Sequence, residues 1–122
     1  MIGFSGLVTF LPVSDLEAAH EFYANVLGLE LAIDQESCQI YRVATGGFIG
    51  ICEHLDGESG GVITTLVTEA VDDWYSRLEA AGVALEAQPR QNERFGIYHF
   101  FVTDPSGNRL EVQRFKSPGL PA

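Results

Sequence analysis

The stretch VSDLEAAHEFYANVLGL, residues 13–29, decides how the first half of this chain folds. Ser14 and Glu17 have the spacing of a capping box, in which the serine hydroxyl accepts from the amide three residues on and the glutamate reaches back. Apolar residues then recur at helical spacing and predict one buried stripe, made of Leu16, Ala19, Phe22, Tyr23, Val26 and Leu27. Gly28 predicts the end of the helix, because glycine adopts the left-handed conformation of a helix C-terminus without strain.

Four β-rich segments surround this helix. The first is Leu7–Leu11, which ends at Pro12. Three more follow the helix, around Leu29–Ile33, Cys38–Val43 and Phe48–Cys52, with polar or glycine-rich turns between them. The first half is therefore expected to fold as a strand, a helix and three strands.

The second half repeats this order after a polar, glycine-rich linker at Asp56–Gly61. Its expected elements are a strand at Val62–Val67, a helix closed by Gly82, and strands near Val83–Ala87, at Ile97–Thr103 and at Arg109–Arg114. The last two strands are joined by a tight turn at Asp104–Asn108, in which proline sets φ and glycine supplies a positive φ. The polar stretch Gln88–Ile97 is interpreted as a mobile surface loop, with a lid over a site as the alternative.

Two similar halves predict one α+β domain over residues 1–122, with module one at 4–55 and module two at 61–115. A single unit would leave one face of its sheet bare. The two βαβββ modules are therefore expected to form a curved mixed sheet with helices on the outer face.

Charge and composition limit the possible partners. Of 122 residues 46% are hydrophobic, and 7 Lys and Arg against 17 Asp and Glu give a net charge of −10. A field of that sign repels phosphate backbones and anionic lipid headgroups, so neither nucleic-acid nor membrane partners are expected, whereas a cationic ligand would be attracted. No apolar run approaches the roughly 18 residues of a membrane span, and the protein is interpreted as cytoplasmic. Cys38 and Cys52 fit that compartment as reduced, partly buried thiols, with a disulfide as the alternative.

Side-chain alternation separates two faces of the last hairpin. One face is apolar and must pack under a helix; its residues are Tyr98, Phe100, Val102, Leu110 and Val112. The other face mixes polar groups around a phenyl ring; its residues are His99, Phe101, Thr103, Arg109, Glu111 and Gln113. Such a set lines a wet pocket or faces solvent, and we expect the pocket.

Two motifs suggest a family. The first is Val13-Ser14-Asp15-Leu16-Glu17, followed by Phe22-Tyr23 and Val26-Leu27-Gly28-Leu29, and the second is Asp104-Pro105-Ser106-Gly107-Asn108-Arg109-Leu110-Glu111. Together they resemble the vicinal oxygen chelate superfamily, which contains glyoxalase I, extradiol dioxygenases, fosfomycin-resistance enzymes and bleomycin-resistance proteins. The resemblance covers nearly the whole chain and implies the glyoxalase/bleomycin-resistance fold.

The resemblance also implies where a metal ion would bind. The histidine of the first strand corresponds to Val8, a fourth-strand ligand falls near Gly50 or Ile51, and the first strand of the second half has Ile63. The only ligand position that keeps a metal-binding side chain is Glu111. One carboxylate cannot hold a divalent ion that needs three or four ligands, so we expect no metal and no other cofactor. A divalent metal on rearranged ligands is the alternative.

The leading interpretation is a metal-free small-molecule-binding protein similar to the bleomycin-resistance branch, whose members are small acidic homodimers that sequester a bulky cationic drug. The residues expected to bind the ligand are Val8, Phe10, Ile63, Thr65, His99, Phe101, Arg109, Glu111 and Gln113. The alternative is a metal-dependent lyase, isomerase or dioxygenase of the glyoxalase type, with His99 and Glu111 as catalytic candidates. A homodimer is expected because open strand edges can be covered by a second copy.

The charge of the ligand depends on how Glu111 is paired. If the ligand is cationic, Phe101 would stack on it and Glu111 would be its charge partner. Arg109 lies on the same face and could neutralise Glu111, which would favour a neutral or zwitterionic ligand.

Overall fold

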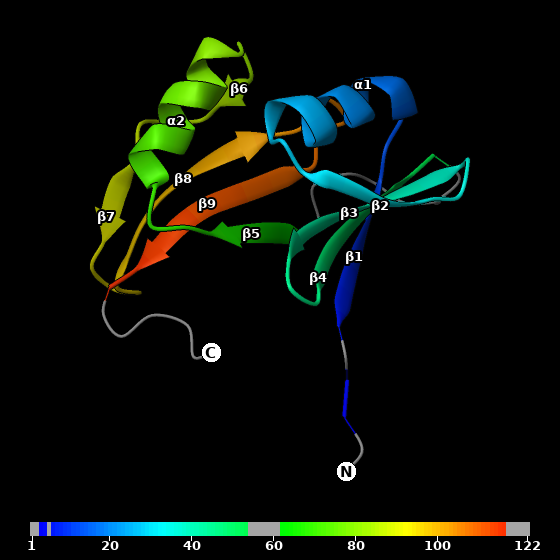
Figure 1. Cartoon of the computed structure of the whole chain (residues 1–122). Helices are drawn as coiled ribbons and strands as arrows, with labels where there is room; N and C mark the ends of the chain where they lie inside the picture. Colours follow the sequence, from blue (N-terminus) through cyan, green and yellow to red (C-terminus); the bar gives the residue numbers. More distant parts are fainter. Residues whose placement is uncertain (1–2, 5, 54–61, 117–122) are drawn as a thin grey trace. The chain divides into compact units, whose positions relative to one another are not determined.

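A computed structural model describes the chain at residues 3–4, 6–53 and 62–116 (Figure 1). Each half begins with a strand and a helical segment, after which three strands follow in the first half and four in the second. Contacts between Cα atoms divide the chain into two compact units. One unit contains Met1–Gly61 and Pro105–Asn108, and the other contains Val62–Asp104 and Arg109–Ala122. The linker expected at Asp56–Gly61 lies outside the described residues.

The first unit forms a four-stranded mixed sheet. Its elements in chain order are β1 (Leu7–Pro12), α1 (Leu16–His20), the π-helical η1 (Glu21–Val26), β2 (Glu30–Asp34), β3 (Cys38–Ala44) and β4 (Gly47–Cys52). The strand order is β1-β4-β3-β2, and β1 runs parallel to β4 while the other pairs are antiparallel. Alternate strand residues form the core with the helix; the buried residues include Leu11, Tyr41, Ile49 and Ile51 from the sheet and Ala19, Phe22 and Tyr23 from the helix.

Tyr41 joins this core to the helix. Its ring stacks on Tyr23 at 6.0 Å between centroids, and its hydroxyl donates to Gln39 Oε1 at 3.0 Å and contacts His20 Nδ1 at 2.5 Å. Burial, with a smaller contribution from Asp34, raises the pKa of Tyr41 to about 12. The phenol is therefore held in its protonated form well above neutral pH.

The start of the first helix differs from the expected capping box. Asp15 is the N-cap, and its carboxylate accepts from the amide of Ala18 at 3.1 Å. The amide of Ser14 donates instead to the hydroxyl of Ser106 at 3.0 Å. The prediction that Ser14 caps the helix is wrong, because two residues that can both cap stand side by side and the helix begins after the second. Gly28 ends the helical region with φ 73°, as predicted.

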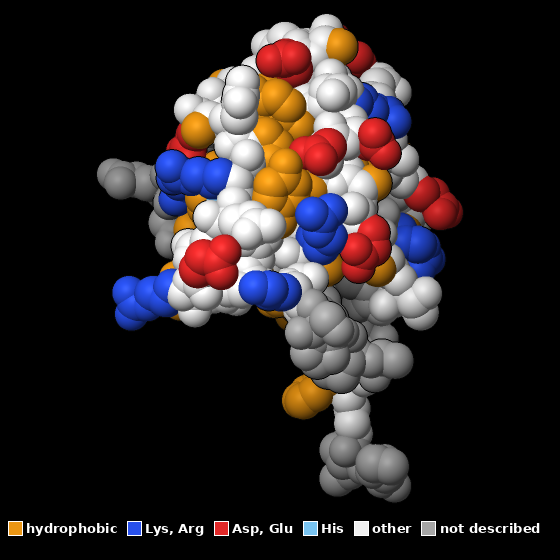
Figure 2. All heavy atoms as spheres, turned by 90° about the vertical axis from the view of Figure 1, so that its left-hand side faces the viewer, with side chains coloured by type: hydrophobic (Ala, Val, Ile, Leu, Met, Phe, Trp, Pro, Cys, Tyr) orange, Lys and Arg blue, Asp and Glu red, His pale blue; other side chains and the backbone are white. Residues whose placement is uncertain are grey.

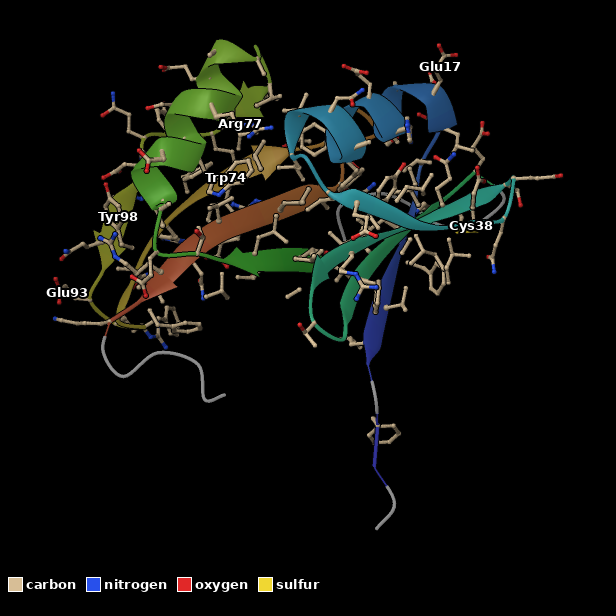
Figure 3. The ribbon with its side chains drawn as sticks, in the orientation of Figure 1. Glu17, Cys38, Trp74, Arg77, Glu93 and Tyr98 are labelled. Atoms are coloured by element: carbon tan, nitrogen blue, oxygen red, sulfur yellow. A yellow bond between two sulfur atoms is a disulfide. The ribbon has the colours of Figure 1, made fainter. Side chains whose placement is uncertain are left out.

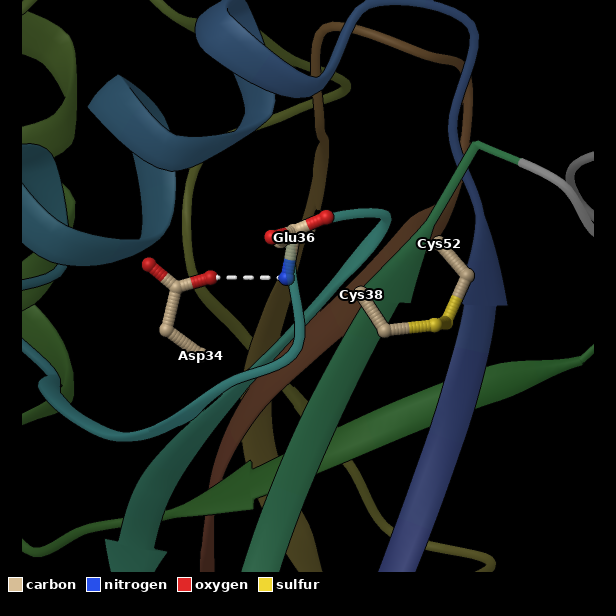
Figure 4. Close-up of a disulfide and its surroundings, with 4 residues drawn as sticks. All are labelled: Asp34, Glu36, Cys38 and Cys52. Carbon is tan, nitrogen blue, oxygen red and sulfur yellow. Dashed lines mark hydrogen bonds between the residues drawn. A yellow bond between two sulfur atoms is a disulfide. The ribbon is translucent and has the colours of Figure 1, made fainter.

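Cys38 and Cys52 form a disulfide, so the expectation of reduced thiols is wrong (Figure 4). The two residues are direct partners in the antiparallel β3–β4 pair, and their Cα atoms lie 4.3 Å apart. The preceding turn sets this geometry: Glu36 has φ 67°, and its amide donates to the Asp34 carboxylate at 3.0 Å. The interpretation of the protein as cytoplasmic, which rested partly on free thiols, stays a prediction. No helix in the described residues has the length and apolar character to cross a membrane.

The second unit contains a five-stranded mixed sheet under one helix. Its elements are β5 (Ile63–Val67), α2 (Val71–Ala80), β6 (Ala84–Leu85), β7 (Arg90–Asn92), β8 (Ile97–Thr103) and β9 (Arg109–Phe115). The strand order is β5-β9-β8-β6, β5 is parallel to β9, and β7 also pairs with β8. Helix α2 contacts β8 and β9 and ends before Gly82, which has φ 73° as expected.

The apolar face of β8 and β9 packs under α2, as the alternation predicts. Its buried residues are Phe100, Val102, Leu110 and Val112, which meet Val71 and Leu78 of the helix. Tyr75 of α2 contacts Phe100 edge to face at 5.3 Å. In the first turn of α2, Asp72 accepts a hydrogen bond at 2.6 Å from the hydroxyl of Tyr98, which is labelled in Figure 3. Among the described residues of the second unit, no helix packs on the opposite face of this hairpin.

The stretch Gln88–Ile97 is not a loop throughout. Arg90–Asn92 forms strand β7 and pairs with Ile97–His99 of β8. The prediction of a mobile surface loop is wrong for Arg90–Asn92, because the backbone of this polar segment pairs with the sheet. The alternative, a lid over a site, stays a prediction. The α+β class with two similar modules is confirmed, and each module has its own hydrogen-bonded sheet.

We expect the disulfide to stabilise the first unit. The bond joins residues 14 positions apart, and closing a loop of about this length stabilises a folded protein by roughly 2–4 kcal/mol. A Cys38→Ala/Cys52→Ala variant should unfold at lower denaturant concentration than the oxidised wild type. Wild type treated with a reductant is the control and should behave like the variant. Equal stability of all three forms would contradict this prediction.

Candidate functional site

A row of polar side chains lies on the face of the second sheet opposite α2. In the β8–β9 register Phe101 pairs with Glu111 and His99 pairs with Gln113, while Thr65 of β5 lies beside Glu111. Cross-strand partners share one face, so these five residues converge as the sequence predicts.

The centre of the row is a hydrogen-bonded pair of His99 and Glu111. Nδ1 of His99 lies 2.6 Å from Oε2 of Glu111, and the two side chains are only 10% and 12% exposed. Thr65 donates its hydroxyl to the other carboxylate oxygen at 2.8 Å. With its amide nitrogen turned toward the carboxylate, Gln113 donates at 3.1 and 3.2 Å.

These contacts favour one tautomer of the neutral imidazole. A carboxylate only accepts hydrogen bonds, so Nδ1 of His99 carries the hydrogen that lies between the two groups. Nε2 of the ring has no hydrogen-bond partner in the described part of the chain. It is therefore available as an acceptor to a group in the pocket.

Arg109 pairs with Glu86 and not with Glu111. Its guanidinium donates to Glu86 through Nε at 3.0 Å and Nη2 at 2.7 Å, and this hydrogen bond raises the pKa of Arg109. The same guanidinium lies over the Phe101 ring, 3.7 Å from its centroid. The expectation that Arg109 could neutralise Glu111 is wrong, because Glu86, the residue after β6, offers it a carboxylate within hydrogen-bond distance.

This row forms part of an open pocket of about 610 Å³. The lining residues are Ile63, Arg90, Gln91, Asn92, Glu93, Phe95, Ile97, His99, Phe101 and Glu111. Four of them were predicted from the sequence: Ile63, His99, Phe101 and Glu111. The residues of β7 were not among the predicted binding residues, although the alternative interpretation of Gln88–Ile97 as a lid had placed this stretch near a site.

Val8 and Phe10, also predicted to bind the ligand, lie on β1 of the first unit and are partly exposed. Val8 and Gly50 carry no metal-binding atom, and a Cβ at Gly50 would lie 2.5 Å from the Phe10 ring. In the second unit Ile63 has no donor, and the carboxylate of Glu111 is engaged by His99 and Thr65. Among the described residues no three His, Cys, Asp or Glu side chains converge. These residues do not fit the metal site that the fold would imply.

The model of one protein family matches residues 6–112. The chain belongs to the Glyoxalase/Bleomycin resistance protein/Dioxygenase superfamily. The resemblance drawn from the two sequence motifs is confirmed, and the order of strands and helices has close counterparts among solved structures.

Three of these structures illustrate the likeness. A superfamily member from Sphaerobacter thermophilus has a TM-score of 0.78 at 24% identity, covering 93% of this chain and 98% of its own. A glyoxalase/bleomycin resistance protein/dioxygenase from Nocardioides has a TM-score of 0.77 at 20% identity, and the match covers 100% of this chain and 89% of the Nocardioides chain. A lactoylglutathione lyase from Agrobacterium tumefaciens has a TM-score of 0.71 at 25% identity, covering 88% and 91%. Comparison with curated proteins gives no match.

We expect neutral His99 to be the Nδ1–H tautomer. The carboxylate of Glu111 accepts that hydrogen in the wild type, whereas a Glu111→Gln side chain can donate as well as accept. Nitrogen NMR of the imidazole should therefore show one tautomer in the wild type and a mixture in the variant. His20, which contacts Tyr41 in the first unit, is the internal control and should not change. An Nε2–H tautomer of His99 in the wild type would contradict the assignment.

Proposed function

We propose that this protein binds a small organic molecule in the pocket of the second unit, and that it does so without a metal ion. The observation that carries the proposal is the buried His99–Glu111 pair on the wall of an open pocket of about 610 Å³. Ligand pockets commonly measure about 300–1,000 Å³ and combine apolar walls with a few placed polar groups. Ile63, Phe95 and Ile97 supply apolar walls here.

The buried pair supports a function beyond folding. Two polar side chains lose water when they are buried, and their attraction only about offsets that loss. Apolar residues of similar volume would serve the sheet as well. A polar pair with an unused imidazole nitrogen facing a pocket is more typical of a binding or reactive site than of a structural contact.

A glyoxalase-type enzyme is the second candidate. The similar structure from Agrobacterium tumefaciens is that of a lactoylglutathione lyase. Glu111 occupies the one metal-ligand position, of those that the family resemblance implies, that keeps a metal-binding side chain. Against this, Val8, Gly50 and Ile63 supply no ligand atoms, and Glu111 already accepts hydrogen bonds from His99 and Thr65. The donor set therefore favours binding without a metal.

We expect organic compounds, and not divalent metals, to raise the thermal stability of the protein. A ligand present at 100 times its dissociation constant adds about 2.7 kcal/mol to the free energy of unfolding. Phe95 lines the pocket while Phe4 is fully exposed in the first unit, so Phe95→Ala should weaken the shift and Phe4→Ala should leave it unchanged. Thermal unfolding of the wild type and the two variants with a panel of compounds and metals measures both effects.

Two outcomes would contradict the proposal of metal-free binding in this pocket. One equivalent of zinc, nickel, manganese or iron in protein purified without chelators, lost in Glu111→Ala, would overturn the metal-free proposal in favour of the enzyme. Equal loss of the ligand effect in Phe95→Ala and Phe4→Ala would show that the compounds bind elsewhere.

We also propose that the protein is a homodimer. Strands β1 and β5 lie at the edges of their sheets, and both expose large apolar side chains, among them Leu7, Phe10, Ile63 and Val67. Exposed apolar edge strands are commonly covered by another chain. Light scattering at micromolar concentration should give twice the chain mass of 13.3 kDa, and a value equal to the chain mass would contradict the dimer.

A further inference from the structure

We propose that the pocket takes a small organic acid, with its carboxylate on the guanidinium of Arg90 and its apolar body against the pocket walls. This inference rests on the proposed function and adds the chemical class of the ligand. It depends on where Arg90 lies, on which charges around it are already paired, and on what the walls are made of.

Arg90 is placed beside His99 by the sheet. The two residues are direct partners in the antiparallel β7–β8 pair, so their side chains leave the sheet on the same face with Cβ atoms about 4.5–5.5 Å apart. Arg90, His99 and Phe101 line both the large pocket and a smaller one of about 200 Å³. Arg90, an exposed residue of the edge strand β7, therefore lies on the walls of two adjoining pockets.

Two carboxylates near Arg90 are engaged by other residues. Glu111 accepts from His99 and Thr65, and Glu86 accepts two hydrogen bonds from Arg109. Glu93 is exposed to solvent and forms only a weak ion pair, 3.8 Å from the ammonium of Lys116. The side chain of Arg90, in contrast, has no hydrogen bond, ion pair or aromatic ring partner within the described part of the chain. On the wall formed by Arg90 and His99 the charge without a partner is therefore positive, and the complementary ligand group there is an anion.

A cationic ligand would find less support in the same contacts. It would face Arg90 and would need a carboxylate that has no other partner. One face of the Phe101 ring is already covered by Arg109 at 3.7 Å, so that face is not open to a ligand cation. The net charge of −10 would attract a cation from a distance, but the charged groups that line the pocket do not favour one.

Among the described residues that line the large pocket, Arg90 is the one Lys or Arg, and together with the apolar walls it favours a carboxylate over a phosphate. One guanidinium matches one planar monoanion, which it can bind through two parallel hydrogen bonds. The apolar walls suit a flat hydrocarbon body, and a dianion would be repelled more strongly by the acidic chain. Figure 2, seen from the side of α2 and β7, shows basic and acidic side chains interspersed rather than one sign gathered in a patch.

Three compounds of nearly equal shape test the inference by calorimetric titration: phenylacetate, phenylacetamide and 2-phenylethylamine. We expect the wild type to bind the acid about tenfold more tightly than the neutral amide, and to bind the amine least. Arg90→Gln should weaken binding of phenylacetate about tenfold and leave phenylacetamide unchanged. Arg77→Gln is the matched control: it removes the same charge from α2, on the other side of the sheet, and should leave all three affinities within about twofold (Figure 3).

The order of the three compounds on the wild type is informative even if Arg90→Gln folds poorly. Binding of the amide or the amine at least as tight as the acid would overturn the organic-acid assignment and leave the pocket intact. No binding of any of the three would count against both this inference and the metal-free pocket. An equal loss of phenylacetate binding in Arg90→Gln and Arg77→Gln would reduce the effect to net charge and contradict the role of Arg90.

Discussion

The register of the β8–β9 hairpin is the constraint on which the second unit depends. Phe100, Val102, Leu110 and Val112 occupy alternate positions and are buried under α2. Burying four such side chains contributes about 6–12 kcal/mol, which is comparable with the whole stability of a typical domain. A shift of one residue would turn all of them to the other face. His99 and Glu111 are therefore held in place by apolar residues that never touch the binding face.

The polar side chains around His99 and Glu111 orient one another but add little to the stability of the fold. Buried ion pairs and hydrogen-bonded pairs roughly offset the cost of their own desolvation, and the partly exposed Arg109–Glu86 pair contributes little. What these contacts do is fix orientation. Glu111 is held by Thr65 on one oxygen and by His99 on the other, so the imidazole presents Nε2 in one direction. Arg109 is held by Glu86 and lies flat on Phe101, which keeps that ring in one position.

The sequence predicted those features that depend on local rules. Gly28 and Gly82 end helices because of their own backbone freedom, and the alternation from His99 to Gln113 follows from the pleat of a strand. Three other features could not be predicted in the same way: that Cys38 is bridged to Cys52, that Arg109 pairs with Glu86, and that Arg90 lies opposite His99. Each depends on which strand lies next to it and in which register, and those are set by packing of the whole sheet. The N-cap of the first helix was predicted one residue too early for a different reason. Ser14 and Asp15 can both cap a helix, and the backbone conformation determines which of them does so.

Net charge and local charge act on different properties of such a site. The charge of −10 acts over a Debye length of about 8 Å at physiological salt, and it changes how often a charged ligand arrives. Affinity depends on contacts within hydrogen-bond distance. A paired carboxylate has few acceptor positions available to a ligand, whereas an unpaired guanidinium has all of its donors available. An acidic protein can therefore hold an anion in a pocket whose own carboxylates are satisfied. The long-range repulsion then slows the approach of the anion, and salt, which screens that repulsion, speeds it. The short-range contact with Arg90 sets how long the anion stays.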